Sequence, residues 1–140
     1  MVKLKEITRF IENMAPLALQ ESYDNSGLLV GTPESVISSA ILCIDVTEEV
    51  VDEAIKKGAQ LIVAHHPIVF SGLKKFTGKN YVERTLIKAI KNDIAIYVAH
   101  TNLDSITGGV NSKICEKLDL EKCKILQPHS GQLKKLITFV

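Results

Sequence analysis

The apolar residues 61–64 lead directly into two adjacent histidines and a proline, His65, His66 and Pro67. Such a run is typical of a buried strand. Neighbouring side chains within a strand point to opposite faces, but Pro67 has no amide hydrogen and ends the regular pairing. We therefore expect both histidines on the turn that leaves the strand, with both rings facing one pocket. The alternative is one buried, hydrogen-bonded histidine and one exposed histidine.

A second apolar run, residues 94–99, ends in similar chemistry, because His100 follows it and Asp104 lies four residues further on. Residues 81–92 have the apolar spacing of a helix, and a helix between two strands predicts that the strands are parallel. Neighbouring strands lie about 5 Å apart, so their carboxyl ends would form one crevice. Its potential ligands are His65, His66, His100 and Asp104. These ligands suit zinc, iron, manganese or nickel, whereas the alternative is a coincidence of polar residues at a sheet edge.

The apolar pattern of the whole chain predicts one α/β domain over residues 1–140, with a mixed, largely parallel sheet flanked by helices. Helices are expected near residues 3–14, 48–57 and 81–92 and after Gly108 and Gly109, and strands over 28–31, 40–44, 61–64, 94–99 and 133–140. Thr47 and Gly58 are suited to begin and end the second helix. The strand at 40–44 is expected to be buried, and the residues expected to face the core include Met14, Ile55 and Ile90.

Other motifs have simple structural explanations. The long connection at residues 68–78 is either a functional lid or a poorly ordered loop. Asp24 and Asn25 lie among turn-forming residues, and an Asx turn is the simplest interpretation of the pair. The amides at Gly108 and Gly109 could bind a phosphate, but loop flexibility is the preferred explanation of these glycines. His129 is expected in an exposed turn.

Charge and cysteine content exclude several classes of protein. The chain has 17 basic and 16 acidic residues and a net charge of +1, so bulk electrostatics attracts neither nucleic acid nor an anionic membrane. It contains no apolar run of transmembrane length, and its N-terminus does not resemble a signal peptide. Cys43, Cys115 and Cys123 form no Cys-x-x-Cys pair. We expect them to be reduced packing residues of a soluble, cytoplasmic protein.

Three motifs in this order resemble the Nif-three-like dinuclear-metal family, whose members are often called GTP cyclohydrolase I type 2 homologues. The motifs are Tyr23-Asp24-Asn25-Ser26-Gly27 with the strand up to Gly31, then Ala64-His65-His66-Pro67, then Ala99-His100-Thr101-Asn102-Leu103-Asp104. The similarity runs over essentially the whole chain. It implies a Nif-three-like α/β fold that assembles as a toroid, commonly a hexamer built from dimers.

The resemblance also implies roles for individual residues. His65, His66 and Asp104 would bind metal, with Asp104 bridging two ions. His100 would be a catalytic residue that transfers protons, and Asn25 would line the pocket beside it. Asp45 and Thr47 would lie at the rim, where they and Asn25 would contact the substrate.

This chain departs from the family pattern in one respect. The family completes its site with a His-x-x-x-Glu pair near the C-terminus, and no glutamate follows Lys122 here. Three ligands can hold one ion with water in the remaining positions, but they hold two ions poorly. We therefore expect an N-terminal portion of a longer protein, with weak or single metal occupancy.

Three hypotheses for function follow from the resemblance. The first is a hydrolase in which divalent ions activate water for attack on a nucleotide or a phosphorylated small molecule, as in opening of a purine ring. The second is a non-catalytic, metal-binding, ring-forming scaffold or interaction protein. The third is an inert chain with a vestigial site. The hydrolase is the leading hypothesis.

Overall fold

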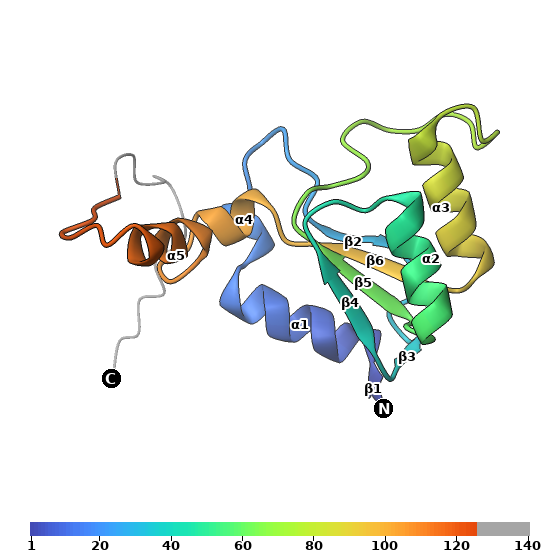
Figure 1. Cartoon of the computed structure of the whole chain (residues 1–140), viewed down its shortest axis with the longest axis horizontal. Helices are drawn as coiled ribbons and strands as arrows, with labels where there is room; N and C mark the ends of the chain where they lie inside the picture. The colour runs from blue at the N-terminus through green and yellow to red at the C-terminus, as the bar shows by residue number, and fades with distance from the viewer. Residues whose placement is uncertain (126–140) are drawn as a thin grey trace, which may run out of the picture.

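The computed structural model describes residues 1–125, and its centre is a four-stranded sheet with helices on both faces (Figure 1). The strands are β2 (Gly27–Val30), β4 (Ala40–Cys43), β5 (Leu61–Ala64) and β6 (Ala95–Val98), in the spatial order β2-β6-β5-β4. β4, β5 and β6 are parallel, and β2 runs antiparallel to β6. A separate pair of short strands is formed by β1 (Val2–Lys3) and β3 (Val36–Ile37). The expected mixed, largely parallel sheet is confirmed.

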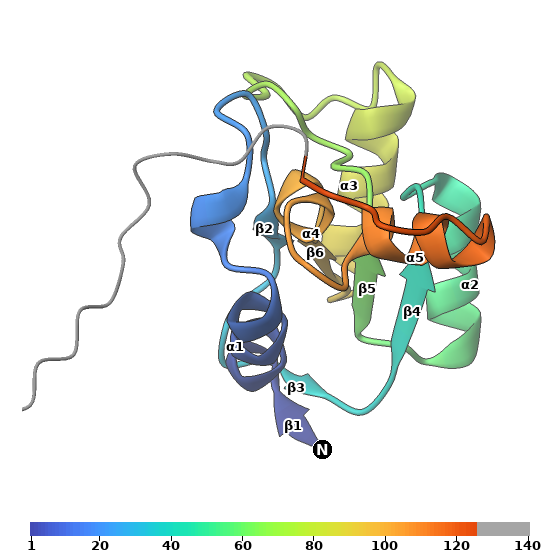
Figure 2. The ribbon, with the colours of Figure 1, turned by 90° about the vertical axis from the view of Figure 1, so that its left-hand side faces the viewer.

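Helices cover the two faces of this sheet unequally (Figure 2). On one face, α2 (Glu48–Lys57) and α3 (Tyr81–Lys91) pack over the strands and form the larger core. On the other face, α1 (Leu4–Met14) packs with a smaller cluster that includes Leu61 and Tyr97. The short turn η1 (Leu17–Leu19) follows α1, and α4 (Thr101–Asp104) and α5 (Val110–Lys117) extend beyond the carboxyl ends of the parallel strands (Figure 1).

Local sequence signals explain how these elements begin and end. The Thr47 hydroxyl accepts a hydrogen bond from the Val50 amide at 3.3 Å, so the predicted N-cap of α2 is confirmed. Gly58 ends the helix in the left-handed conformation, also as predicted. Gly31 leaves β2 with φ +115°, and a Cβ atom there would lie 2.7 Å from the Cβ of Ala95. Only glycine allows this close approach of the chain to β6.

The expectation of a fully buried strand at residues 40–44 is wrong. β4 is an edge strand, and the Leu42 side chain is 79% exposed. Leu42 pairs in register with Val63 and therefore points to the face that α1 covers, but α1 packs over β5 and β6 and leaves β4 bare. Ile41, on the opposite face, packs against the larger core. The apolar pattern thus identified the strand correctly but overestimated its cover.

Other burial predictions also need correction. Met14, Ile55 and Ile90 were expected to face the core, but all three are exposed to solvent. Cys123, expected to be a packing residue, is exposed as well. The predicted strand at 133–140 and the turn with His129 lie outside the described residues, and within residues 1–125 no helix is long and apolar enough to cross a bilayer.

Candidate metal centre

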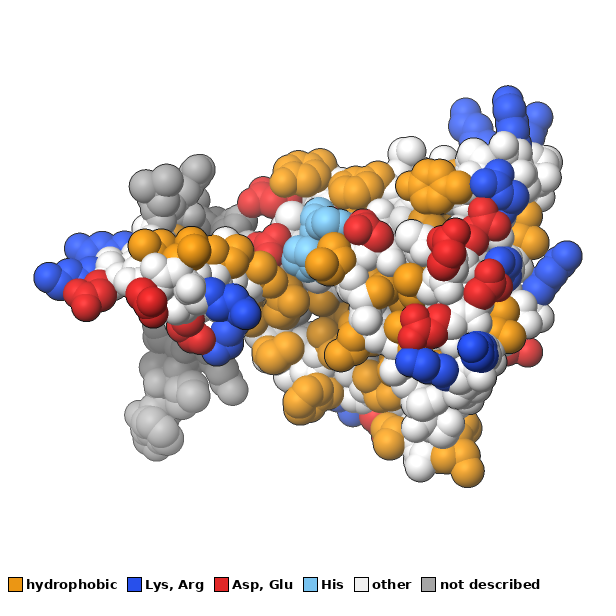
Figure 3. All heavy atoms as spheres, viewed as in Figure 1, with side chains coloured by type: hydrophobic (Ala, Val, Ile, Leu, Met, Phe, Trp, Pro, Cys, Tyr) orange, Lys and Arg blue, Asp and Glu red, His pale blue; other side chains and the backbone are white. Residues whose placement is uncertain are grey.

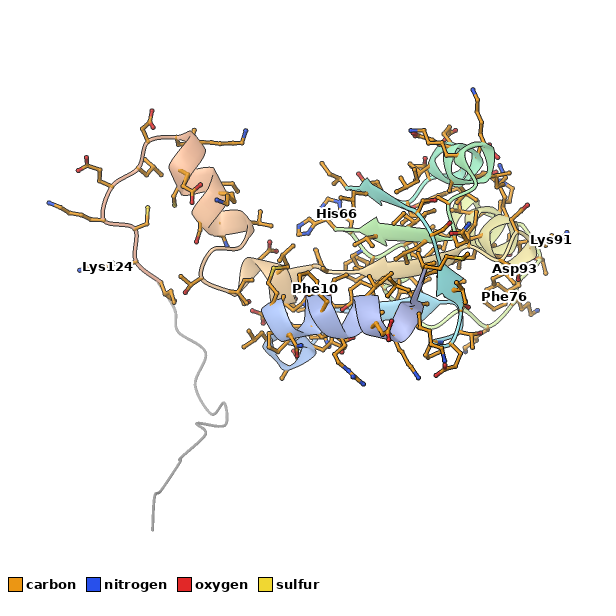
Figure 4. All side chains as sticks on the ribbon, turned by 90° about the horizontal axis from the view of Figure 1, so that it is seen from below. Phe10, His66, Phe76, Lys91, Asp93 and Lys124 are labelled. Carbon is orange, nitrogen blue, oxygen red and sulfur yellow. The ribbon has the colours of Figure 1, made fainter. Side chains whose placement is uncertain are left out.

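The two histidine motifs lie side by side because β5 and β6 are adjacent parallel strands, as predicted. Pairing continues one residue past the end of β6: the Ala99 amide donates to the carbonyl of Ala64, the last residue of β5, at 3.0 Å. The chain then bends at His65 and His66. Figure 4 shows His66 projecting from this end, whereas Phe76, Lys91 and Asp93 lie at the opposite end of the molecule.

Three imidazoles form one cluster at this edge. The ring centroid of His65 lies 5.1 Å from that of His66 and 5.3 Å from that of His100, and the third pair is 5.7 Å apart. One ring nitrogen from each histidine lies within 4.8 Å of those of the other two. The histidines reach the surface at the end of the sheet from which α4 and α5 extend (Figure 3). The two adjacent histidines therefore form one cluster with the third, as expected.

Each of the three rings is held through its Nδ1 atom. The partners are the Ala99 carbonyl for His65 at 2.9 Å, Asp45 for His66 at 2.8 Å and Asp24 for His100 at 2.9 Å. A carbonyl and an ionised carboxylate only accept hydrogen bonds, so each Nδ1 must carry the hydrogen. The lone pair of each neutral ring is then on Nε2. This arrangement is the usual one for histidines that bind metal.

Asp104, on α4, lies beside this cluster without joining it. Its Oδ1 atom is 3.7 Å from the Nε2 atom of His65, which is too long for a hydrogen bond. Two ligands of a tetrahedral ion, each about 2.1 Å from the metal, lie about 3.4 Å apart. The separation therefore fits a shared ion, and the donor set of imidazoles and one carboxylate fits a divalent metal.

Asp24 contacts the histidine cluster in a way that sequence reasoning missed. Its side chain is 0% exposed and accepts five hydrogen bonds. The donors are the Asn25 amide, the Ser26 hydroxyl, the His100 ring, and the amide and hydroxyl of Thr101. Burial acts to raise the pKa of Asp24, but the hydrogen bonds from Thr101, His100, Ser26 and Asn25 outweigh burial and hold the pKa well below its ordinary value.

The predicted Asx turn accounts for only part of this network. The contacts with Asn25 and Ser26 are local, as a turn requires, whereas those with His100 and Thr101 join segments 76 and 77 residues apart. Asn102, fully buried, supports the same corner, because its side chain accepts from the His100 amide and donates to the Ala15 carbonyl. No sequence pattern indicated either long-range contact.

The residues expected to contact substrate occupy different positions. Asp45 is at the rim, bound to His66, and the Thr47 hydroxyl caps α2. The side-chain amide of Asn25 donates to the Val69 carbonyl at 2.7 Å and so fixes the start of the long connection at residues 68–78. Asn25 also lines a mainly apolar cavity of about 200 Å³ between this connection, β2 and α3. These placements leave the substrate-binding roles of all three residues as predictions.

The long connection also contributes an aromatic ring to the histidine cluster. The ring of Phe70 lies 5.9 Å from that of His100, edge-on, and its side chain is exposed. The far end of the connection is held by Glu83, which accepts hydrogen bonds from the amides of Thr77 and Lys79. The connection is therefore fixed at both ends and open to solvent in its middle.

Comparisons with known proteins agree with this fold. The family model described as Duf34/NIF3 (NGG1p interacting factor 3) matches residues 2–139. A GTP cyclohydrolase 1 type 2 homolog from Clostridium acetobutylicum is 38% identical over 134 residues, which are 96% of this chain and 50% of that protein.

Two solved structures are similar as well. The Bacillus cereus protein related to NIF3 has a TM-score of 0.86 at 42% identity, over 91% of this chain and 35% of its own. Reduced HcgD from Methanocaldococcus jannaschii has a TM-score of 0.82 at 36% identity, over 90% of this chain and 50% of its own. The chain thus spans about half the length, or less, of these relatives.

Proposed function

The chain belongs to the Duf34/NIF3 family, and from this premise we propose that it binds a divalent metal ion and uses it to hydrolyse a nucleotide or another phosphorylated small molecule. One observation carries the proposal: three imidazoles converge, and each is held at Nδ1 so that its Nε2 lone pair is free. The proposal places the protein in the cytoplasm, where its thiols stay reduced.

The proposed ligands are His65, His66, His100 and Asp104. His65 and His66 keep the ligand role expected from the sequence. His100 offers an equivalent nitrogen, so we propose it as a third imidazole ligand in place of the expected role in proton transfer. Asp104 would take a fourth position on the same ion or contact a second one. A bound divalent ion lowers the pKa of water and neutralises charge on a leaving oxygen.

Elemental analysis of the purified chain tests the metal proposal directly. We expect about one zinc, iron, manganese or nickel ion per chain, since four protein ligands suffice for one ion. The variants His65→Ala and His100→Gln should each lose most of the metal. His129→Ala is the matched control, because it removes the one histidine of the sequence that is not among the proposed ligands. Unchanged metal content in His100→Gln, with loss in His65→Ala, would restore proton transfer as the role of His100.

Hydrolysis is tested separately with nucleotides and phosphodiesters, with and without manganese. Turnover that disappears in His65→Ala and persists in His129→Ala supports an enzyme. Absence of turnover with every metal, in protein that binds metal, contradicts it.

A second candidate is a non-catalytic, ring-forming scaffold, favoured by the uncovered apolar face of β4. Leu42 is 79% exposed and Ile44 is 64% exposed, both near the carboxyl end of the sheet. Surfaces of this kind often mark protein interfaces. We propose that the chain forms a homo-oligomer through this face, a hexamer built from dimers in the complete assembly. The mass in solution of the wild type and of Leu42→Asp tests this, and a monomeric wild type contradicts it.

A further inference from the structure

We propose that Asp24 is the positioning residue of the metal centre, which holds the His100 ring with Nδ1 protonated and Nε2 directed toward the other imidazoles. The inference rests on the proposed function only where it concerns metal. The orientation of the ring and the location of its hydrogen are properties of the metal-free chain. Asp24 therefore acts through His100 and does not itself contact the ion.

The hydrogen bonds of Asp24 exclude it as a ligand. Its Oδ1 atom accepts from the Asn25 amide at 2.6 Å and from the His100 ring at 2.9 Å. Its Oδ2 atom accepts from the Ser26 hydroxyl at 2.9 Å and from both the amide and the hydroxyl of Thr101. An ionised carboxylate has about four lone-pair sites, and five donors occupy them. Because the side chain is also fully buried, no oxygen is left for a metal.

The two hydroxyl groups in this network have fixed directions. The Thr101 hydroxyl accepts from the Glu21 amide at 2.9 Å, so its own hydrogen points to Asp24. The Ser26 hydroxyl accepts from the His100 amide at 3.3 Å, so its hydrogen points to Asp24 as well. Three hydrogens therefore converge on Oδ2, and none of these donors can turn into an acceptor without losing a second bond. These hydrogen bonds fix the orientation of the carboxylate in the metal-free protein.

This locking predicts which way an asparagine would lie at position 24. In Asp24→Asn the amide oxygen must occupy the Oδ2 position, where three donors meet it. The NH₂ group then takes the Oδ1 position, where it loses the one bond from the Asn25 backbone amide and donates to Nδ1 of the His100 ring. The ring responds by moving its hydrogen to Nε2, which removes the lone pair that binds metal. A similar exchange of tautomers is the accepted reason why an asparagine fails in place of the aspartate of a serine-protease triad.

The chain offers a matched control in the pair formed by His66 and Asp45. Its Nδ1 to Oδ1 distance is 2.8 Å, close to that of His100 and Asp24, but the Asp45 side chain is 66% exposed. In Asp45→Asn the new amide can rotate, and water can accept from the His66 ring. We therefore expect the His66 tautomer to survive. Comparison of the two asparagine variants separates positioning by a buried carboxylate from a general effect of charge.

The first measurement is the tautomer of each histidine in metal-free protein, from long-range proton–nitrogen correlation spectra of the full chain. We expect hydrogen on Nδ1 of His100 and of His66 in the wild type, and a change to Nε2 at His100 alone in Asp24→Asn. Hydrogen on Nε2 of His100 in the wild type overturns the proposal, even if the variant does not fold. A variant that folds with His100 unchanged overturns it too.

The second measurement is zinc affinity, by competition with a chromophoric chelator. We expect Asp24→Asn to bind zinc 10- to 100-fold more weakly than the wild type, the usual range for loss of a partner behind a ligand, and Asp45→Asn to differ by less than about threefold. Equal affinity of the wild type and Asp24→Asn overturns the role in metal binding. If the wild type does not bind zinc, the proposed function fails, while the tautomer measurement still decides the role of Asp24.

Discussion

The two histidine–carboxylate pairs of this molecule have nearly the same contact distance but opposite surroundings. His100 and Asp24 are joined in the interior, where four further hydrogen bonds hold the carboxylate. His66 and Asp45 are joined at the surface, where both side chains are largely open to solvent. The contact distance alone therefore does not show how firmly a carboxylate holds the histidine ring. The interior pair fixes a ring, whereas the surface pair only favours one of its orientations.

The difference arises from how each aspartate reaches its histidine. Asp45 follows β4, the bare edge strand, so solvent competes for its oxygens. Asp24 precedes β2, which pairs with β6. Its carboxylate therefore lies against the residues that follow β6, where the Thr101 amide donates to it. Burial removes water as a competitor, and a buried carboxylate requires protein donors for every lone pair. Removal of the carboxylate should therefore lower the free energy of unfolding more at Asp24 than at Asp45.

The largest predicted effect is that of Asp24→Ala on stability. Its removal leaves the His100 ring and both donors of Thr101 without their acceptor inside the protein. We expect the free energy of unfolding to fall by about 3–5 kcal/mol, the usual loss when one partner of a buried pair is deleted. Urea denaturation of metal-free protein measures it. A loss no larger than that of Asp45→Ala would contradict the distinction between the two pairs.

Glu83 sharpens the comparison because it is a nearly buried carboxylate without a histidine. Hydrogen bonds from the backbone of Thr77 and Lys79, then from the Thr77 hydroxyl, lower its pKa. Because the pKa in the folded state lies below that in the unfolded chain, this stabilisation is present above the unfolded value of about 4.3 and is lost as the pH falls toward the folded value. Acid should therefore loosen the connection at residues 68–78.

The hydrogen-exchange rates of the Thr77 and Lys79 backbone amides test this prediction. In Glu83→Gln we expect exchange at both amides to be faster, on the order of tenfold at neutral pH, because a neutral amide accepts less strongly than a carboxylate. The wild type should approach this behaviour as the pH is lowered, and the variant should respond less. Glu53→Gln, on the exposed face of α2, is the control. Equal acceleration in the two variants would argue against the anchoring role of Glu83.

The smallest predicted effect is that of Asp45→Ala. Exposed ion pairs and hydrogen bonds contribute little, because water replaces the lost partner. We expect the free energy of unfolding to change by less than about 1 kcal/mol. The same denaturation experiment measures it, and a loss comparable with that of Asp24→Ala would show that exposure is not what separates the pairs.

The sequence predicted those parts of the site that depend on short-range patterns. Apolar runs ending in His65 and His100 located two parallel strand ends, and Thr47 marked the start of α2. Exposure of Leu42 was not predictable, because alternation along a strand does not show which face another element will cover. The role of Asp24 was also hidden, since a turn explains an aspartate at that position and its main partners are more than 70 residues away.

The central position of β6 has a consequence for folding. β6 lies between β2 and β5, so the three-imidazole cluster with its Asp24 support forms only after strands have joined β6 from both sides. An ion that binds this arrangement and not the unfolded chain stabilises the native state by mass action, by about 2.7 kcal/mol at a hundredfold excess over its Kd. Metal uptake would then report that β2 and β5 have both paired with β6, and not the presence of a short local peptide.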